Sequence, residues 1–349
     1  MVLGRDARAW WRRARSLIPD AAPDWDRLQG RLEAFGAALL DRRLKIAVTG
    51  LSRSGKTVLI TSLAHHLERG VGLPFLNAVA DRRYLGAVPA RQVPAGITPF
   101  PYHAHHAALA GETPHWPAPS TDLSLLRLEL RFQPRGGFVR RFGDARTLTL
   151  DIVDYPGEWL IDLPLLEDSY AGWAGVTLAR LRAEPYRAAM APFFESLASR
   201  EAETVVAAYV DGLERCRRAR LSLLQPGRAL TPTALDGAPE TALFAPVPPD
   251  HPLAARFRAR FETYVERWVR PFKTHVVDAV DRQIVLLDVL ESLNRGPAHF
   301  DDTRAALALV LEAFNHGRSS YWQRLLAPKV EKLVFCATKA DHVANTQHA

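Results

Sequence analysis

The chain has 349 residues and a formal net charge of +7, and 48% of its residues are hydrophobic. This length and apolar content suffice for more than one compact unit with its own core, and no apolar run approaches the ~18 residues that a membrane-spanning helix needs. The two cysteines form neither a disulfide framework nor a metal-binding motif. The composition therefore argues against a small secreted scaffold and is typical of a cytoplasmic protein.

In the N-terminal segment, residues 5–42 are predicted to be helical, with breaks at Pro19 and Pro23. Five arginines flank Trp10 and Trp11 in this segment: Arg5, Arg8, Arg12, Arg13 and Arg15. A basic helix with adjacent Trp side chains can lie on an anionic membrane surface. A solvated helix that packs its Trp side chains on the protein explains the same pattern. No nucleic-acid recognition module is visible, so we expect no specific nucleic-acid partner.

The first functional motif follows a strand predicted over residues 44–49. Gly50 and the next seven residues, LSRSGKT, complete the P-loop pattern G-x-x-x-x-G-K-[ST], which opens a helix predicted over 56–69. Backbone N–H groups of such a loop bind the α- and β-phosphates of a nucleotide. We expect Lys56 to reach the β- and γ-phosphates and the Thr57 hydroxyl to bind Mg²⁺. The other residues of the predicted phosphate site are Ser52, Arg53, Ser54, Gly55 and Val58.

A segment rich in Pro and Gly, residues 70–122, is predicted to be a long loop. In P-loop switch proteins this is the first switch region, which supplies a Thr to Mg²⁺ and the γ-phosphate. We choose Thr98, in the stretch AGITPFP, with Thr113 and Thr121 as alternatives. A loop of this kind more often leaves histidines solvated than bound to a metal, and we expect that state for the four histidines His103, His105, His106 and His115.

A buried strand predicted over 146–153 ends in the sequence DYPG, the D-x-x-G pattern of a GTPase. Asp154 is expected to hold Mg²⁺ through water, and the Gly157 N–H to sense the γ-phosphate. The ordering of such a loop is how switch proteins signal their nucleotide state. Glu158 stands where many GTPases carry the Gln that positions the attacking water. Because a carboxylate there repels the γ-phosphate, we expect slow hydrolysis.

Residues 158–280 exceed what a minimal nucleotide domain contains. They include predicted helical stretches at 177–224 and 251–281, separated by a Pro-rich piece, 225–252, which we expect to be a surface loop. Because the D-x-x-G motif opens this insertion, a nucleotide-dependent movement at Gly157 would push on its base. The remaining predicted elements are strands over 123–132, 283–289 and 331–337 and a helix over about 301–315.

The last predicted strand ends in the sequence TKAD, a variant of the guanine-reading N-K-x-D motif. Asp341 can accept hydrogen bonds from the N1–H and 2-amino groups of guanine, a donor pair that adenine lacks. The stem of Lys339 would lie on the base. Thr338 replaces the Asn that usually ties this loop to the P-loop, so one hydrogen bond is lost or replaced.

Four stretches together resemble the YcjX-like family of predicted bacterial P-loop GTPases: GLSRSGKTVLITSL, DIVDYPGEWLIDLPLL, QIVLLDVLESLNRGP and KLVFCATKADHV. The resemblance covers essentially the whole chain. It implies a Ras-like α/β domain with helices on both faces of the sheet, a mainly helical insertion, a cytoplasmic location and an association with bacterial stress responses. The implied bound groups are Mg²⁺ and GTP or GDP. Arg53 is similarly placed to the arginine that guanylate-binding and atlastin-type GTPases use as a finger in cis; the alternative is a solvent-facing loop arginine.

From these motifs we divide the chain into four parts: a basic helical segment (1–42), a first part of the nucleotide domain (43–157), a helical insertion (158–280) and a second part of the nucleotide domain (281–349). The chain ends soon after Asp341, where a Ras-like domain needs a further strand, a guanine-contacting loop and a helix. We therefore expect a weakened affinity for guanine and an exposed edge strand.

The function indicated is a GTP-binding switch protein that hydrolyses GTP slowly with Mg²⁺. Two alternatives stay open. An ATP-dependent P-loop phosphotransferase would contain the TKAD sequence only as a strand end. A membrane-surface adaptor would bind a nucleotide only to stabilise its fold.

Overall fold

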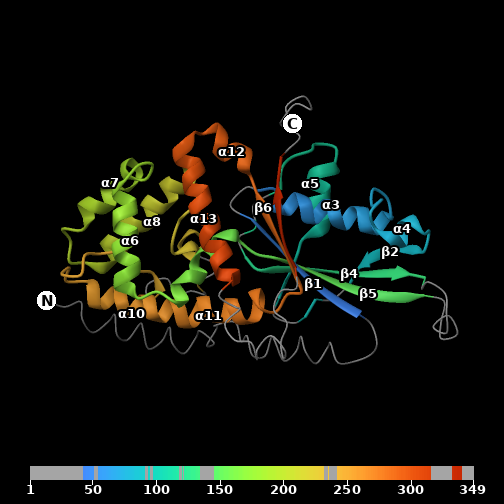
Figure 1. Ribbon diagram of the computed structural model, residues 1–349, viewed down its shortest axis with the longest axis horizontal. Coiled ribbons are helices and arrows are strands. Elements are labelled where there is room, and N and C mark those ends of the chain that lie inside the picture. The colour runs from blue at the N-terminus through green and yellow to red at the C-terminus, as the bar shows by residue number, and fades with distance from the viewer. Residues whose placement is uncertain are drawn as a thin grey trace.

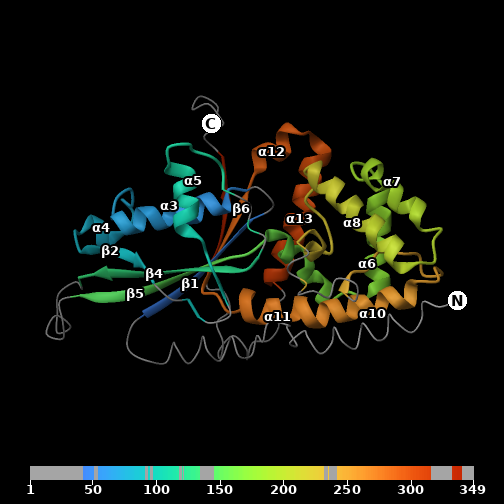
Figure 2. The same cartoon turned by 180° about the vertical axis from the view of Figure 1, so that it is seen from behind.

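The computed structural model describes residues 42–50, 54–90, 93–94, 97–117, 120, 122–133, 145–231, 235, 242–315 and 332–339. The molecule is elongated: a twisted sheet and its helices form one end, and a helical unit forms the other (Figure 1 and Figure 2). Of the helix predicted over 5–42, residues 5–41 lie outside the described residues, and Arg42 is the first residue of a strand. Among the described helices, none combines the length and the apolar character that crossing a membrane requires.

The described strands form one seven-stranded sheet. They are β1 (Arg42–Gly50), β2 (Tyr84–Pro89), β3 (Thr98–Pro99), β4 (Ser124–Phe132), β5 (Arg146–Asp154), β6 (Arg282–Leu287) and β7 (Lys332–Ala337). Their order is β2-β4-β5-β1-β6-β7, and β3 pairs with β4. β1 is parallel to β5 and β6, β6 is parallel to β7, and β4 is antiparallel to β5. The carboxyl ends of β1, β5, β6 and β7 therefore meet at one edge of the sheet, together with the start of β4.

One face of the sheet is covered by helices that follow β1 and β3 (Figure 1). The helices at this end are α3 (Lys56–Arg69), α4 (Asn77–Ala80) and α5 (Tyr102–Ala110). Side chains alternate along β1: Leu44, Ile46 and Val48 join the apolar cluster under α3, whereas Ala47 belongs to the core of the helical unit. The period of two in a strand thus directs neighbouring residues to two different cores.

The helical unit follows β5 and occupies the other end of the molecule (Figure 2). Its helical elements are η2 (Gly157–Leu166), α6 (Tyr170–Arg182), α7 (Arg187–Ser196), α8 (Ala202–Arg218), η3 (Gly227–Leu230), α10 (Ala254–Tyr264), η5 (Val265–Val269), α11 (Arg270–Phe272) and η6 (Lys273–Val277). The last four form one continuous helical run, in which η5 and η6 are π-helical turns.

Two further helices, α12 (Val289–Asn294) and α13 (Pro297–Asn315), follow β6. Ala306 and Val310 of α13 lie in the core of the helical unit. The Asp302 carboxylate of the same helix accepts hydrogen bonds from the Tyr186 hydroxyl and from the Ser222 N–H, the latter at 2.5 Å. Although α13 follows a strand of the sheet in the sequence, it therefore packs as part of the helical unit.

The structure confirms the predicted α/β class and the main strands, with small differences at their ends. β6 ends at Leu287, before the predicted end, and α13 begins at Pro297, before the predicted start. The helical stretch predicted over 177–224 is three separate helices, and the one predicted over 251–281 is the run from Ala254 to Val277.

Two predictions of irregular structure were wrong. The segment 70–122 is not a continuous loop, because it contains β2, β3, α4 and α5. The described parts of the Pro-rich piece 225–252 do not form a surface loop: residues 225–231 and 244–247 are buried. Proline and glycine indicate turns, but here these turns fill the interior between η2 and α10.

A buried carboxylate at the centre of the helical unit joins these turns to the helices. Asp162 is fully buried and accepts hydrogen bonds from the Gly227 N–H at 2.8 Å and from the Tyr264 hydroxyl at 2.5 Å. Burial raises the pKa of Asp162 to about 6, and the Arg228 guanidinium, 4.0 Å away, opposes the rise. A carboxyl with a raised pKa binds its proton more tightly in the folded state.

The raised pKa of Asp162 predicts that the folded protein loses stability as the pH increases. Between the unfolded value of 3.8 and the folded value near 6, the folded protein holds more protons than the unfolded chain, so stability decreases through this window. Relative to Asp162→Asn, the free energy of unfolding of the wild type should fall by about 2 kcal/mol from ~pH 4 to ~pH 7, at 1.36 kcal/mol per unit of pKa. Urea unfolding at fixed pH values measures this difference, and a difference that does not change with pH would contradict it.

Candidate functional site

The P-loop leads directly into α3 at the carboxyl edge of the sheet. Gly55 has a φ of +86°, a left-handed conformation that suits glycine, and the helix begins at the next residue. No described side chain caps the N-terminus of this 14-residue helix, and its first turn contains no acidic residue. Its first N–H groups are therefore available to an anion. Ser52 and Arg53 lie outside the described residues, Ser54 is buried, and Val58 is half-buried in the first turn.

Four polar side chains form a continuous chain of contacts beside this helix end. Lys56 Nζ lies 2.5 Å from Asp154 Oδ1, and both side chains are largely buried. The Ser120 hydroxyl donates to Asp154 Oδ2 at 2.6 Å and lies 3.4 Å from the Thr57 hydroxyl oxygen. The two hydroxyls and the carboxylate together supply hard oxygen atoms, the kind of ligand that Mg²⁺ prefers.

The pairing of β4 with β5 explains why Ser120 reaches this site. Ser124, the first residue of β4, pairs with Asp154, the last residue of β5. The residues just before β4 therefore arrive beside the D-x-x-G motif. The sequence analysis missed Ser120, although the predicted strands 123–132 and 146–153 could have indicated it if they had been paired as an antiparallel hairpin.

Of the three threonines considered from the sequence, the two that the structure describes lie away from this contact chain. Thr98 is exposed at the start of β3, where it pairs with Ser124 of β4. Thr113 is exposed in the turn after α5, and its carbonyl oxygen is bonded to His115 Nδ1 at 3.1 Å. Thr121 lies outside the described residues. In the described part of the chain, the hydroxyl next to Thr57 and Asp154 is that of Ser120.

The histidines of the same segment differ in exposure. His103 and His115 are exposed, as expected, whereas His105 and His106 are half-buried against α3 and the core. His106 Nε2 lies 3.0 Å from His65 Nδ1, and their rings stack with centroids 4.7 Å apart. No group of three or more candidate metal ligands of the His, Cys, Asp and Glu types occurs among the residues that the structure describes.

The D-x-x-G loop is packed into the helical unit. Tyr155 follows Asp154, is fully buried, and donates its hydroxyl to Gln283 Oε1 at 3.1 Å. Its ring meets the Phe272 ring edge-on, with centroids 5.1 Å apart, and the Trp159 ring meets the same Phe272 at 5.5 Å. Tyr155 and Trp159, on either side of Gly157 in the sequence, thus share one aromatic partner on α11.

A second contact with this loop comes from the buried start of η3. A Cβ atom at Gly227 would lie 2.0 Å from the backbone oxygen of Glu158, so only glycine fits there. The next residue, Arg228, is buried with its guanidinium carbon 4.2 Å from the centre of the Trp159 ring. Glu158 itself is half-buried, whereas Gly157 is buried. The helical unit therefore fixes both sides of the D-x-x-G loop.

The TKAD segment lies at the same edge of the sheet, after β7. The Thr338 N–H and hydroxyl both donate to the Leu287 carbonyl, at 2.8 Å and 3.2 Å. Thr338 thus ties this loop to the end of β6. Lys339, in a left-handed conformation with φ of +60°, pairs with Asp288, an acidic residue that the sequence analysis did not identify. Asp341 lies outside the described residues.

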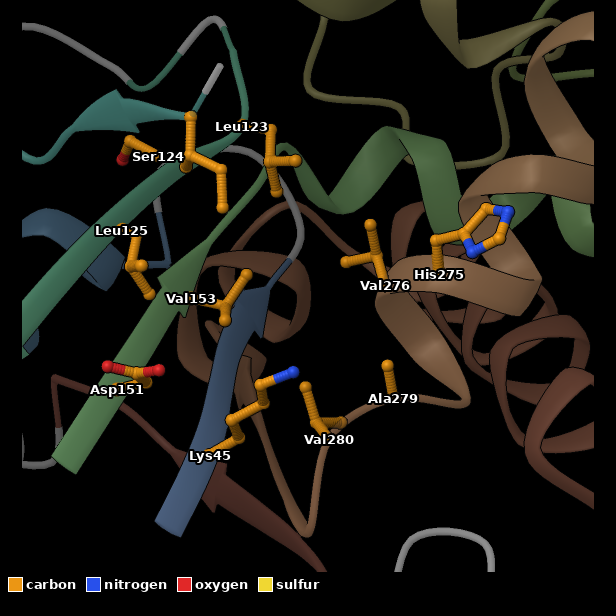
Figure 3. Close-up of a pocket in the computed structure, with 11 residues that line it drawn as sticks. Lys45, Leu123, Ser124, Leu125, Asp151, Val153, His275, Val276, Ala279 and Val280 are labelled. Carbon is orange, nitrogen blue, oxygen red and sulfur yellow. The ribbon is translucent and has the colours of Figure 1, made fainter. Parts of the chain in front are cut away.

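A separate pocket lies on the face of the sheet away from α3 (Figure 3). The Lys45 side chain of β1 extends into it, toward Val276 and Val280 at the end of the helical run. Burial lowers the pKa of Lys45, and Asp151 and Asp281 oppose the decrease. This pocket belongs to the opposite face of the sheet and contains none of the four residues Lys56, Thr57, Ser120 and Asp154.

Comparisons with known proteins identify relatives of this chain. Residues 44–349 match the YcjX-like family, DUF463. The chain is 38% identical over 347 residues to the "Ras-like GTPase YcjX" of Escherichia coli K12, covering 93% of this chain and 74% of that protein. It is 35% identical over 342 residues to the protein of the same name from Shewanella oneidensis, covering 88% of this chain and 70% of that protein. The fold is Ras-like, and the chain belongs to the YcjX-like family.

Proposed function

We propose that this protein binds GTP with Mg²⁺ and hydrolyses it slowly, as a molecular switch. The observation that carries the proposal is the contact chain of Lys56, Asp154, Ser120 and Thr57 beside the uncapped N-terminus of α3. A lysine, two hydroxyls and a carboxylate in this order suit the terminal phosphates of a nucleotide and their metal ion. The two relatives are themselves named as GTPases.

Each of these four residues then has a role. Lys56, which is paired with Asp154 at 2.5 Å, exchanges this partner for the β- and γ-phosphates. The freed Asp154 carboxylate and the hydroxyls of Thr57 and Ser120 hold Mg²⁺ directly or through water. When bound, the metal neutralises charge that develops on the transferred phosphoryl group. We propose Ser120 as the first-switch ligand in place of Thr98.

The remaining site roles are proposals that follow from the motifs. Arg53 acts as a finger in cis, the Gly157 N–H senses the γ-phosphate, and Glu158 orients water poorly enough to keep hydrolysis slow. Ser52, Ser54, Gly55 and Val58 line the phosphate site, and Thr338, Lys339 and Asp341 the guanine site. The ion pair of Lys339 with Asp288 supports a fixed position of the Lys339 stem.

We propose that the protein acts in the cytoplasm as a regulatory GTPase connected with stress responses. We also propose that its domains divide at residues 42, 157 and 280. A peripheral membrane contact through the basic N-terminal helix is part of the same proposal. Flotation with liposomes, with and without residues 1–20, tests that contact separately from nucleotide binding.

Nucleotide competition tests the proposed function. GTP should displace a bound fluorescent GTP analogue at concentrations at least about 10²-fold lower than ATP does, because adenine lacks the donor pair that a guanine site reads. Lys56→Ala should weaken GTP binding by at least about 10²-fold, since it removes the cation nearest the expected phosphates. Lys45→Ala, on β1 and in the pocket on the other face of the sheet, is the matched control and should bind normally. Equal competition by ATP would favour the phosphotransferase alternative.

The choice of Ser120 over Thr98 gives a separate prediction. Ser120→Ala should raise the Mg²⁺ concentration needed for half-maximal binding of the GTP analogue by about tenfold, because the site loses one oxygen ligand. Thr98→Ala should leave this concentration unchanged, since Thr98 is exposed at the start of β3. A Mg²⁺ titration of each variant makes the measurement. If only Thr98→Ala changed the required Mg²⁺ concentration, Thr98 and not Ser120 would be the first-switch ligand.

A further inference from the structure

We propose that the loop between α3 and α4 docks on the surface of an anionic lipid bilayer. This loop, residues 71–76 with the sequence VGLPFL, is called the apolar tip below. The proposal does not depend on nucleotide binding, and it concerns a different part of the molecule from the N-terminal helix.

The apolar tip exposes large side chains although its backbone is held in place. Phe75 is 97% exposed, Val71 is 54% exposed, and Leu76 is 36% exposed. The Leu76 N–H donates to the Leu73 carbonyl at 3.1 Å, and His66 Nδ1 is bonded to the Val71 carbonyl at 3.1 Å. Apolar side chains gathered on the surface in this way mark an interaction site.

The position of the apolar tip suits contact with an extended surface. It lies between α3 and α4 at the end of the molecule opposite the helical unit (Figure 1 and Figure 2). The 14-residue helix α3 separates it from the P-loop, a distance of roughly 21 Å at 1.5 Å per residue. Docking through the tip would therefore leave the candidate nucleotide site open to solvent.

The charge around the apolar tip favours an anionic partner. Arg69 and Arg82 are exposed on either side of it, and Arg83 is held nearby by Asp81 and by the Gln133 carbonyl. The nearby carboxylates are Asp81, which is paired with Arg83, and Glu68, which accepts a hydrogen bond from the Tyr102 hydroxyl, so the arginines leave a net positive charge. Arginines around an apolar aromatic tip allow the ring to enter the headgroup region while the cations meet anionic lipids.

The neighbouring edge strand argues against the addition of a strand from another chain. β2 has a shift of register between Tyr84 and Gly86, its Gly86 has a φ of +109°, and it ends at Pro89. Bulges and prolines of this kind protect sheet edges from pairing with other strands. A protruding ring on a loop also fits a deformable bilayer better than a flat protein surface. A second copy of the chain is therefore the less favoured partner.

Vesicle binding by the full chain tests the proposal. The wild type should sediment with vesicles that contain phosphatidylglycerol and should bind pure phosphatidylcholine vesicles much more weakly. The double variant Phe75→Ser/Leu76→Ser should lose at least about tenfold in partitioning, because it removes the apolar side chains that enter the bilayer. Val176→Ser is the matched control: Val176 is 70% exposed on α6, at the other end of the molecule, and its replacement should change nothing. The double variant Arg69→Gln/Arg82→Gln should bind the vesicles more weakly, and its remaining binding should be less sensitive to salt.

Several results would overturn the proposal. Equal vesicle binding by the wild type and the Phe75→Ser/Leu76→Ser variant would assign the contact to another segment, such as residues 1–20. The absence of wild-type binding would also reject it. Sedimentation velocity that shows a dimer in the wild type and a monomer in the variant, with unchanged vesicle binding, would make the apolar tip an interface between copies. Circular dichroism of each variant confirms folding, and the assay is independent of whether GTP binds.

Discussion

The packing of the D-x-x-G loop against one phenylalanine is the constraint that joins the two ends of this molecule. The Phe272 ring on α11 contacts both the Tyr155 ring and the Trp159 ring edge-on. Tyr155 directly follows Asp154, the partner of the P-loop lysine. Because the interior is closely packed, the loop cannot move toward a γ-phosphate without a response from the aromatic side chains around Phe272. The candidate nucleotide site and the helical unit are therefore mechanically connected.

The helix that carries Phe272 is suited to such a response. Two π-helical turns, Val265–Val269 and Lys273–Val277, flank the short α11. π-helical turns are frequent at functional sites, since each inserts a residue into the regular helical repeat. The other side of the helical unit is anchored through Asp302 on α13, a helix that follows β6. The unit thus receives contacts from elements that begin at the carboxyl ends of both β5 and β6.

Motif spacing made the strand ends predictable, because the P-loop, D-x-x-G and TKAD sequences each require a buried strand before them. Ser120 was missed because a single serine carries no motif, and its position depends on the pairing of β4 with β5. The buried turn around Gly227 was missed for another reason: its Pro and Gly composition is typical of a surface loop, and its contacts with Glu158 and Asp162 are distant in sequence. Asp288, similarly, is identified only by its pairing with Lys339.

Hydrogen–deuterium exchange of the full chain, compared between GDP and a non-hydrolysable GTP analogue, tests the mechanical connection most directly. The connection predicts that exchange changes in the helical run Ala254–Val277 as well as in the P-loop and D-x-x-G peptides, because Phe272 follows the movement of Tyr155 and Trp159. In Phe272→Leu, the nucleotide-dependent change in the helical run should decrease while that at the P-loop persists. Changes confined to the P-loop and D-x-x-G peptides in the wild type would contradict the account.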